Sequence, residues 1–276
     1  MSAVSPAPAA PAPGAPSATV SNALASEWLK LRSLRSTWVI LAVAVLLGVG
    51  LGVLIAHLVA GLYHQHRPAA VVNWDPTAIS LGALGIAQLV MAVLGAMAIT
   101  GEYSSGMIRT SLTAVPGRGR LMAAKSAVVT LTALVAGEVI AFAAFFLGQL
   151  AIGSSAPQAS IGGAHVLRAV AGAGLYLAVI ALLACGVGFL VRSTAAAISV
   201  MVALVFVLPA ILSALPPSWS NVIDKYWPTQ AGAQIYGVVR RNPQHTLTAW
   251  AGFGDLCLFT AIVLVAAYWL LRVRNA

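Results

Sequence analysis

The chain contains six long apolar segments that alternate with short polar stretches. The apolar segments cover residues 38–62, 79–100, 126–152, 169–191, 195–215 and 249–271. Each has about 20 residues or more, which is the length that an α-helix needs to cross the hydrocarbon core of a bilayer. The pattern therefore predicts an all-α integral membrane protein with six transmembrane helices over residues 38–276.

The two segments that precede the first apolar stretch differ from it in composition. Residues 1–19 are rich in alanine, proline and serine and lack both a basic start and an apolar centre, so we expect a disordered tail and not a secretory signal. Residues 20–37 are too short and too polar to span a bilayer.

Residues 20–37 have the spacing of an amphipathic helix. Val20, Leu24, Trp28 and Leu31 follow one helical face, and Lys30 falls on the other side together with Glu27. Such a helix is suited to the membrane interface, and its candidate interfacial residues are Trp28, Lys30, Leu31 and Arg32. An ordinary basic flank of the first span is the alternative.

Charge defines the topology of the chain and excludes several classes of protein. Only 8% of the residues are charged, whereas about 25% are charged in an ordinary soluble domain. The net charge of +9 comes from basic residues between the apolar segments, which argues against a nucleic-acid partner. Ten of the fifteen Lys and Arg residues fall on the side of the N-terminus, so both termini are predicted to be cytoplasmic.

The two cysteines lie in apolar segments without further ligands nearby, so no metal site is expected.

The loop between the second and third apolar segments, residues 101–125, is the most informative polar stretch. Met107, Ile108, Leu112 and Val115 form a short apolar stripe, and Pro116-Gly117 would end a helix there. A short helix held between two rigid spans could dock into a groove of a cytoplasmic partner. A basic loop lying on anionic headgroups is an equally good interpretation.

One carboxylate interrupts the third apolar segment. Glu138 lies about twelve residues into this span, or roughly 18 Å, which is near the middle of a hydrocarbon core of about 30 Å. A charge at this depth costs at least about 2.5 kcal/mol. Glu138 is therefore expected either to line a translocation path or to hydrogen-bond to a neighbouring helix.

Four features resemble the permease subunit of type-2 ATP-binding-cassette (ABC) exporters of the short actinobacterial kind. These features are EWLKLRSLRSTW at residues 27–38, GEYSSGMIRTSLTAVPGRGRLMAAK at residues 101–125, GEVIAFAAFFLGQL at residues 137–150, and six spans with a long connection between the last two. The resemblance implies a bacterial plasma-membrane exporter in which two permease copies form the path. It also implies a coupling helix within residues 105–115, an interface helix around Trp28, and short re-entrant helices within residues 215–248. The docking residues for the ATPase would be Glu102, Ser105, Gly106, Met107, Ile108, Arg109 and Leu112.

The chain lacks the motifs of an energy-converting or hydrolytic enzyme. Its three lysines do not follow a glycine, so it contains no G-x-x-x-x-G-K-[ST] loop, and no H-E-x-x-H is present. The resemblance thus implies that the permease is not itself an enzyme, needs no cofactor, and relies on a separate subunit to bind ATP. A proton-coupled carrier and a non-transporting membrane scaffold remain as alternatives.

Overall fold

The computed structural model describes residues 20–63, 74–108, 117–240 and 243–273. These residues form helices and connecting turns without a β-strand. Six helices in them are long and apolar enough to cross a membrane, which confirms the prediction of an all-α, six-span protein. The predicted N-terminal tail lies outside the described residues.

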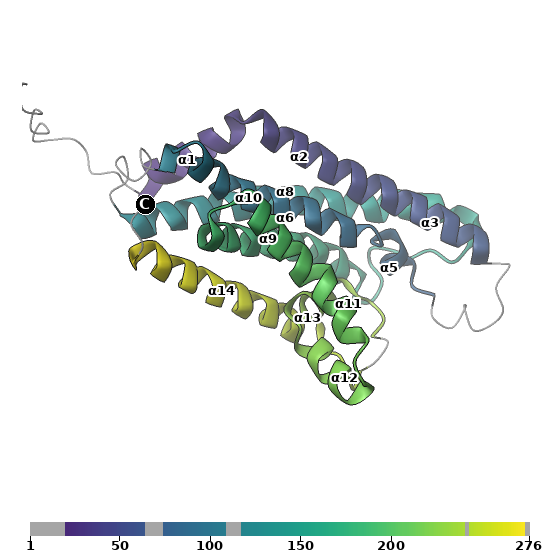
Figure 1. Cartoon of the computed structure of the whole chain (residues 1–276). Helices are drawn as coiled ribbons and strands as arrows, with labels where there is room; N and C mark the ends of the chain where they lie inside the picture. Colours follow the sequence, from purple (N-terminus) through teal and green to yellow (C-terminus); the bar gives the residue numbers. More distant parts are fainter. Residues whose placement is uncertain (1–19, 64–73, 109–116, 241–242, 274–276) are drawn as a thin grey trace, which may run out of the picture.

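The six spans run alternately in opposite directions through one bundle (Figure 1). The first span consists of α2 (Arg35–Val45), the π-turn η1 (Leu46–Gly50) and α3 (Leu51–Leu62). The next three are α6 (Leu84–Ser104), α8 (Arg118–Ile152) with the short η3 (Gly153–Ser155), and α9 (Val166–Val191). The fifth comprises α10 (Thr194–Val202), the π-turn η4 (Ala203–Val207) and α11 (Leu208–Ser213), and the sixth is α14 (Ala249–Val273). We call proximal the end that carries α1 (Val20–Ser33) and the last turn of α14, and distal the opposite end.

The fourth span, α9, forms the centre of the bundle. In its most apolar stretch 72% of the residues are buried, against 22% in the first, fifth and sixth spans. Glycines allow its neighbours to approach closely: a Cβ on Gly95 of α6 would lie 1.9 Å from the Ala181 carbonyl oxygen of α9. A Cβ on Gly137 of α8 would lie 2.8 Å from the Gly174 carbonyl oxygen. Such small residues support helix association in lipid, where helices gain no hydrophobic energy by leaving the solvent.

The first span contacts this core through a stripe of small residues. The buried members of the stripe recur every four positions, at Ala44, Gly48, Gly52, Ala56 and Ala60. They face α6, α8 and the short helix before α6, while large apolar side chains such as Leu46, Leu54 and Leu58 are exposed on the other faces. This arrangement is typical of a peripheral span that presents leucines to lipid.

Short helices form much of the distal end. Helix α5 (Pro76–Ser80) begins with a cap, since the Asp75 carboxylate accepts a 3.0 Å hydrogen bond from the amide of Ala78. The connection between the fifth and sixth spans contains α12 (Pro217–Tyr226), α13 (Pro228–Ala233) and η5 (Gln234–Tyr236), with α12 beyond the end of α11 (Figure 1). Trp227 fixes this connection to the fifth span by donating a 2.9 Å hydrogen bond from Nε1 to the Leu204 carbonyl oxygen. A re-entrant position in the membrane stays a prediction for these helices.

Three predicted boundaries differ from the helix ends in the structure. The second apolar segment is broken at residues 81–83, so that α5 precedes α6, and α6 continues past residue 100 to Ser104. The third span begins at Arg118 instead of residue 126 because arginine and lysine are good helix formers. The segment 20–37 is not one helix, because Leu34 is extended (φ −79°, ψ 119°) and separates α1 from α2.

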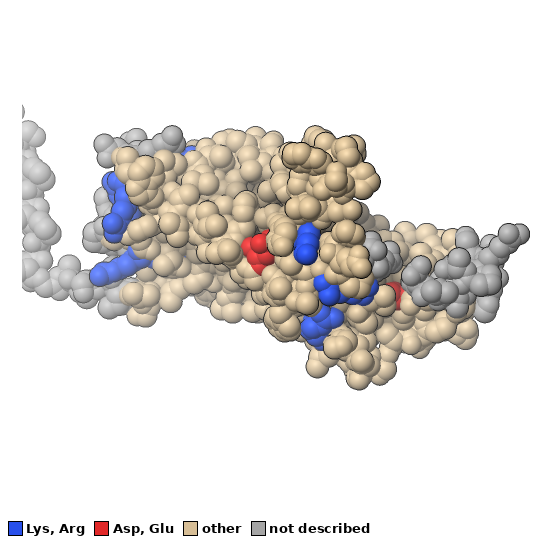
Figure 2. Space-filling model, turned by 90° about the horizontal axis from the view of Figure 1, so that it is seen from below, with Lys and Arg blue, Asp and Glu red and all other residues tan. Residues whose placement is uncertain are grey.

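On one face of the bundle the Lys and Arg side chains fall into two separate groups (Figure 2). This face shows a group of Lys and Arg at the proximal end, a second group toward the distal end, and a mostly uncharged surface between them (Figure 2). This distribution is what a protein that crosses a lipid bilayer requires.

The close contact at Gly95 generates a prediction. Gly95→Ala should destabilise the bundle by about 1–3 kcal/mol, because the added methyl group collides with the backbone of α9. Thermal unfolding of the detergent-solubilised protein would measure this loss. Gly85→Ala on the same helix is the control, because a Cβ there meets no atom within 4 Å and alanine has the higher helix propensity. Equal stability of the two variants would contradict this packing.

Candidate functional site

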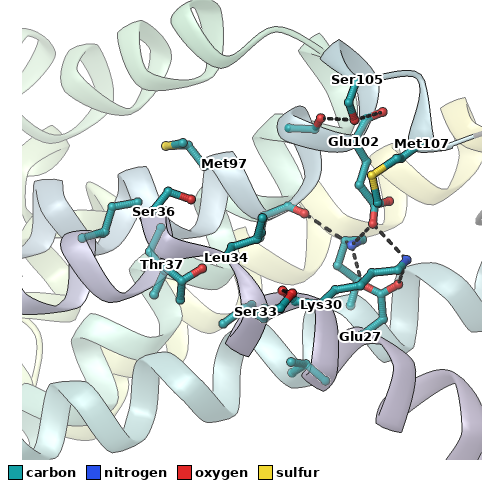
Figure 3. A pocket seen from close by; sticks show the side chains of 17 residues that line it. Glu27, Lys30, Ser33, Leu34, Ser36, Thr37, Met97, Glu102, Ser105 and Met107 are labelled. Atoms are coloured by element: carbon teal, nitrogen blue, oxygen red, sulfur yellow. Dashed lines mark hydrogen bonds and ion pairs between the residues drawn. The ribbon is translucent and has the colours of Figure 1, made fainter.

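Four charged side chains from three elements converge at the proximal end. Glu27 and Lys30 come from α1, Glu102 from the last turn of α6, and Lys125 from the third turn of α8. We call these four residues the proximal charge cluster. Figure 3 shows Glu27, Lys30 and Glu102 pointing toward one another beneath the end of α6.

Each ammonium group in the cluster bridges both carboxylates. The Nζ atom of Lys30 lies 2.7 Å from Glu27 Oε1 and 3.1 Å from Glu102 Oε1. The Nζ atom of Lys125 lies 3.0 Å from Glu102 Oε1, pairs with Glu27 Oε2, and also donates to the Ala98 carbonyl oxygen at 3.3 Å. The cluster therefore joins α1, α6 and α8 without leaving a net charge among its members.

Burial makes the cluster a strong constraint on the fold. Glu27 is 3% exposed, Lys125 4% and Glu102 7%, so each charge depends on its partners and not on water. Removal of one partner from a buried ion pair typically costs about 3–5 kcal/mol, because an uncompensated charge is left behind. The three helix ends must therefore stay together for any of the charges to be tolerated.

The two α1 residues of the cluster have shifted pKa values. Burial by itself would raise the pKa of the Glu27 carboxyl, but the ammonium groups of Lys125 and Lys30 outweigh burial and hold its pKa below the ordinary 4.5. Burial would likewise lower the pKa of Lys30, but its hydrogen bond to Glu27 and the charge of Glu102 raise it above 10.5. Both groups are thus charged at neutral pH.

A pocket of about 310 Å³ opens beside the cluster. The charged residues form one part of its wall, and apolar side chains of α1, α2, α6 and α8, including Leu31, Ile40, Leu94 and Val128, form another part. The extended residue Leu34, where the chain turns from α1 into α2, also lines it. The pocket thus lies between the start of the first span and the ends of the second and third.

The end of α6 is also held from its other side. The Arg192 guanidinium lies over the ring of Tyr103 at 5.2 Å, and Thr194 Oγ1 donates to Thr100 Oγ1 at 2.7 Å. Arg192 occupies a left-handed conformation (φ 57°) where α9 ends, a backbone geometry that non-glycine residues adopt rarely. The fourth and fifth spans therefore meet the last turn of α6 opposite the charge cluster.

The predicted docking residues divide into two groups. Glu102 belongs to α6 and points into the cluster, and Ile108 is 5% exposed. Ser105, Gly106 and Met107 are exposed just past the end of α6, with Gly106 in a left-handed conformation (φ 71°). Arg109, Leu112 and most of the predicted coupling helix lie outside the described residues.

The apolar residues predicted for one face of the N-terminal helix divide into two groups. Val20 and Trp28 are 58% and 44% exposed, whereas Leu31 is buried together with Ala23 and Glu27. Lys30 lies in the cluster and Arg32 is exposed. Burial of Glu27 is tolerated because the ammonium groups of Lys30 and Lys125 pair with it. A position of α1 in the membrane interface stays a prediction.

Sequence reasoning missed the pairing between Glu27 and Lys125. The available signal was the placement of one acidic and one basic residue beside the ends of successive spans, at Glu102 and Lys125, with a second acidic residue in the amphipathic helix. Charges at matching depths in a membrane protein tend to pair with one another. The sequence alone did not show which of them would meet.

Glu138 lies apart from the cluster, thirteen residues further along α8, or about 20 Å. Its carboxyl group covers Gly174 of α9, where a Cβ would lie 2.4 Å from Glu138 Cδ. The side chain is half-buried, and none of the described residues forms a hydrogen bond or ion pair with it. Glycine at position 174 thus makes the space in which this carboxyl group sits.

Comparison with known proteins agrees with this architecture. A family model described as ABC-2 family transporter protein matches residues 23–210, which is more than half of the chain. The matched range contains the whole proximal charge cluster, the first four spans and most of the fifth. No curated protein matches the chain significantly in sequence.

The cluster predicts a pH-dependent contribution to stability. Glu27→Gln should lower the free energy of unfolding by up to about 3 kcal/mol at neutral pH, because Lys125 loses one of its two carboxylate partners. Since the pKa of Glu27 is depressed in the folded protein, its stabilising effect is complete above pH 4.5 and is lost as the pH falls through the depressed value. The difference from wild type should therefore shrink in acid.

Thermal unfolding of the two proteins in detergent, at neutral pH and at values below 4.5, would measure this difference. Asp224→Asn on α12 is the matched control, since that carboxylate forms no ion pair with the described residues and should change stability by at most about 0.5 kcal/mol. A Glu27→Gln effect that stays constant with pH would contradict a charge-based role.

Proposed function

Because the chain belongs to the ABC-2 transporter family and is therefore a multi-pass membrane permease of an ABC transporter, we propose that it is the membrane subunit of an exporter. In this proposal two permease copies form the translocation path, and a separate ATP-binding-cassette subunit supplies the energy. The membrane is the bacterial plasma membrane, with the proximal end in the cytoplasm. That orientation places ten of the fifteen basic residues on the cytoplasmic side.

The proximal charge cluster is the observation that carries this proposal. It connects the end of α6 at Glu102, just before the loop between the second and third spans (the second loop), to the N-terminal helix through Lys30 and to the third span through Lys125. Lys125 also pairs with Glu27 of the N-terminal helix. A displacement applied to that loop by a partner would move all three elements together, because separating them would leave buried charges unpaired. The cluster thus offers a mechanical link between an ATPase and the spans.

The exposed residues after α6 offer the surface on which the ATPase would dock. Ser105 and Met107 face solvent, and Met107 is 45% exposed at the rim of the pocket beside the cluster. Methionine is common on surfaces that bind partners because its side chain is flexible and apolar. The coupling helix would continue from this point through residues 109–115.

Glu138 is proposed to line the translocation path. Its carboxyl group lies in the middle of a membrane-spanning helix without an ion-pair partner among the described residues, and a glycine on the neighbouring span leaves room for it. A carboxyl group in this position also keeps a proton-coupled carrier as the second candidate function. The two candidates differ in whether transport requires ATP.

Docking at the second loop can be tested by purification from native membranes. The C-terminally tagged protein, solubilised in mild detergent, should retain a Walker-motif ATPase that mass spectrometry identifies. The double variant Ser105→Trp/Met107→Asp should reduce the retained ATPase about tenfold, which corresponds to about 1.4 kcal/mol of binding energy. Trp219→Ser is the control, because Trp219 is 67% exposed at the distal end. Wild-type protein that retains no ATPase would count against the exporter subunit itself, and full retention by the variant would exclude this docking site.

The role of Glu138 can be separated from a structural one by comparing transport with yield. Glu138→Gln should reduce ATP-driven efflux of a hydrophobic fluorescent dye from reconstituted vesicles at least about fivefold, a loss of about 1 kcal/mol, and should leave the amount of folded protein near the wild-type level. Asp255→Asn, which alters the carboxylate of the sixth span, is the control. A variant that mainly lowers the folded yield would support the structural role instead. Efflux that follows a pH gradient without ATP would favour the carrier.

A further inference from the structure

A second pocket, at the distal end, is lined by cationic side chains. It has a volume of about 400 Å³ and lies between the first turns of α9 and α14 and the chain that follows η5. Arg168 of α9 and Arg240 contribute guanidinium groups to its wall, and His165 and Thr248 stand immediately before the two helices. We call this cavity the distal basic pocket.

The two arginines retain hydrogen-bond donors for a ligand. Arg168 uses one Nη2–H to bond to the Gly237 carbonyl oxygen at 2.7 Å, while its Nε is buried without a partner in the described chain. Arg240 is anchored to its own loop, with Nε 3.1 Å from Thr246 Oγ1 and Nη2 2.9 Å from the Pro243 carbonyl oxygen. Its Nη1 forms no such bond to the described residues. Guanidinium groups fixed in this way match the geometry of a bound oxyanion.

The positive charge of the pocket is not neutralised from within. No carboxylate stands among its described lining residues, and neither arginine forms an ion pair in the described parts of the chain. The nearby Asp75 carboxylate, whose Oδ1 accepts from the amide of Ala78 at 3.0 Å and Oδ2 from the amide of Val239 at 3.4 Å, brings one negative charge close to the pocket. The guanidinium groups of Arg168 and Arg240 exceed that charge, so an anion would still meet a net positive charge there.

The helices that end at the pocket add to its positive potential. In α14 the first backbone amide with a bond to the preceding turn is that of Gly252, which donates to the Thr248 carbonyl oxygen at 2.8 Å. The first turn of a helix leaves amide groups without intrahelical partners, and Ala249 and Trp250 of this turn line the pocket. Helix α9 also begins without a side-chain cap. Both long helices thus direct the positive end of their dipoles toward one cavity.

We propose that the distal basic pocket binds a phosphate ester through Arg168 and Arg240. The volume exceeds the space that a phosphate group needs and leaves room for an esterified group. Trp250 at the rim is 62% exposed, and tryptophan favours the headgroup level of a bilayer. The phosphodiester of a lipid in the leaflet at the distal end fits both observations. The site is independent of the proposed exporter role, because a permease, a carrier or a scaffold could each hold such a lipid.

Binding can be measured on the full-length protein in maltoside detergent, with dihexanoyl phosphatidylglycerol as the probe. Native mass spectrometry and titration calorimetry should detect a saturable site. Arg168→Gln and, separately, Arg240→Gln should each weaken binding about tenfold, the equivalent of about 1.4 kcal/mol. Lys225→Gln is the matched control, because it removes one positive charge at the same end from a residue that does not line the pocket. Arg240 is exposed, so its variant decides the question if Arg168→Gln does not fold.

Two further probes distinguish the source of the phosphate. Inorganic phosphate that displaces the lipid at similar concentration would support a site for soluble phosphate esters, and failure to displace it would support a lipid headgroup. Dihexanoylglycerol, which lacks the phosphate, should not bind. The proposal would be overturned by equal binding of dihexanoylglycerol, by binding that survives both arginine substitutions, or by an equal loss in Lys225→Gln.

Discussion

The burial of Lys125 at the proximal end of the bundle is the constraint on which the arrangement of this protein depends. An ammonium group that is 4% exposed requires counter-charges, and Lys125 finds them on two other elements, α1 and α6. Glu27 brings the N-terminal helix onto the bundle, and Glu102 fixes the end of the second span against the beginning of the third. Apolar packing alone would let these helix ends slide, because lipid solvates them as well as their neighbours do.

The remainder of the bundle supports this constraint by close packing around one helix. The fourth span contacts several other spans, and glycines at these contacts bring the helix backbones close together in the part of the bundle that lies away from the cluster. Arg192 and Thr194 then meet the last turn of α6 from the side opposite the cluster. The last turn of α6 is therefore held by the N-terminal helix on one side and by the end of the central helix on the other.

The sequence predicted the six spans well because the thickness of a bilayer imposes a length that apolar runs reveal directly. It placed the starts of the second and third spans wrongly, since a helix stops where its hydrogen bonds stop and not where its apolar residues do. Residues 118–125 were assigned to a loop because they are basic, yet Lys125 is buried once its partners are in place. The burial of Glu27 was missed for the same reason: a helical wheel does not show where the partners of a charged group lie. Glu138 could be identified from the sequence as a charge at depth, but Gly174, which makes room for it, could not.

The π-turn in the first span has a consequence for the rotational phase of that helix. A straight α-helix turns about 100° per residue, so a stripe repeating every four residues from Ala44 to Ala60 would drift by about 160° and wind off the core. The extra residue accommodated between Leu46 and Gly50 takes back about 100° of that drift, which leaves about 60° spread along the span. The regular four-residue spacing in the sequence therefore stays on one side of the helix. Deleting one residue within the turn would restore regular hydrogen bonding without moving the stripe off the core, whereas a deletion on either side would rotate one half of the stripe toward lipid.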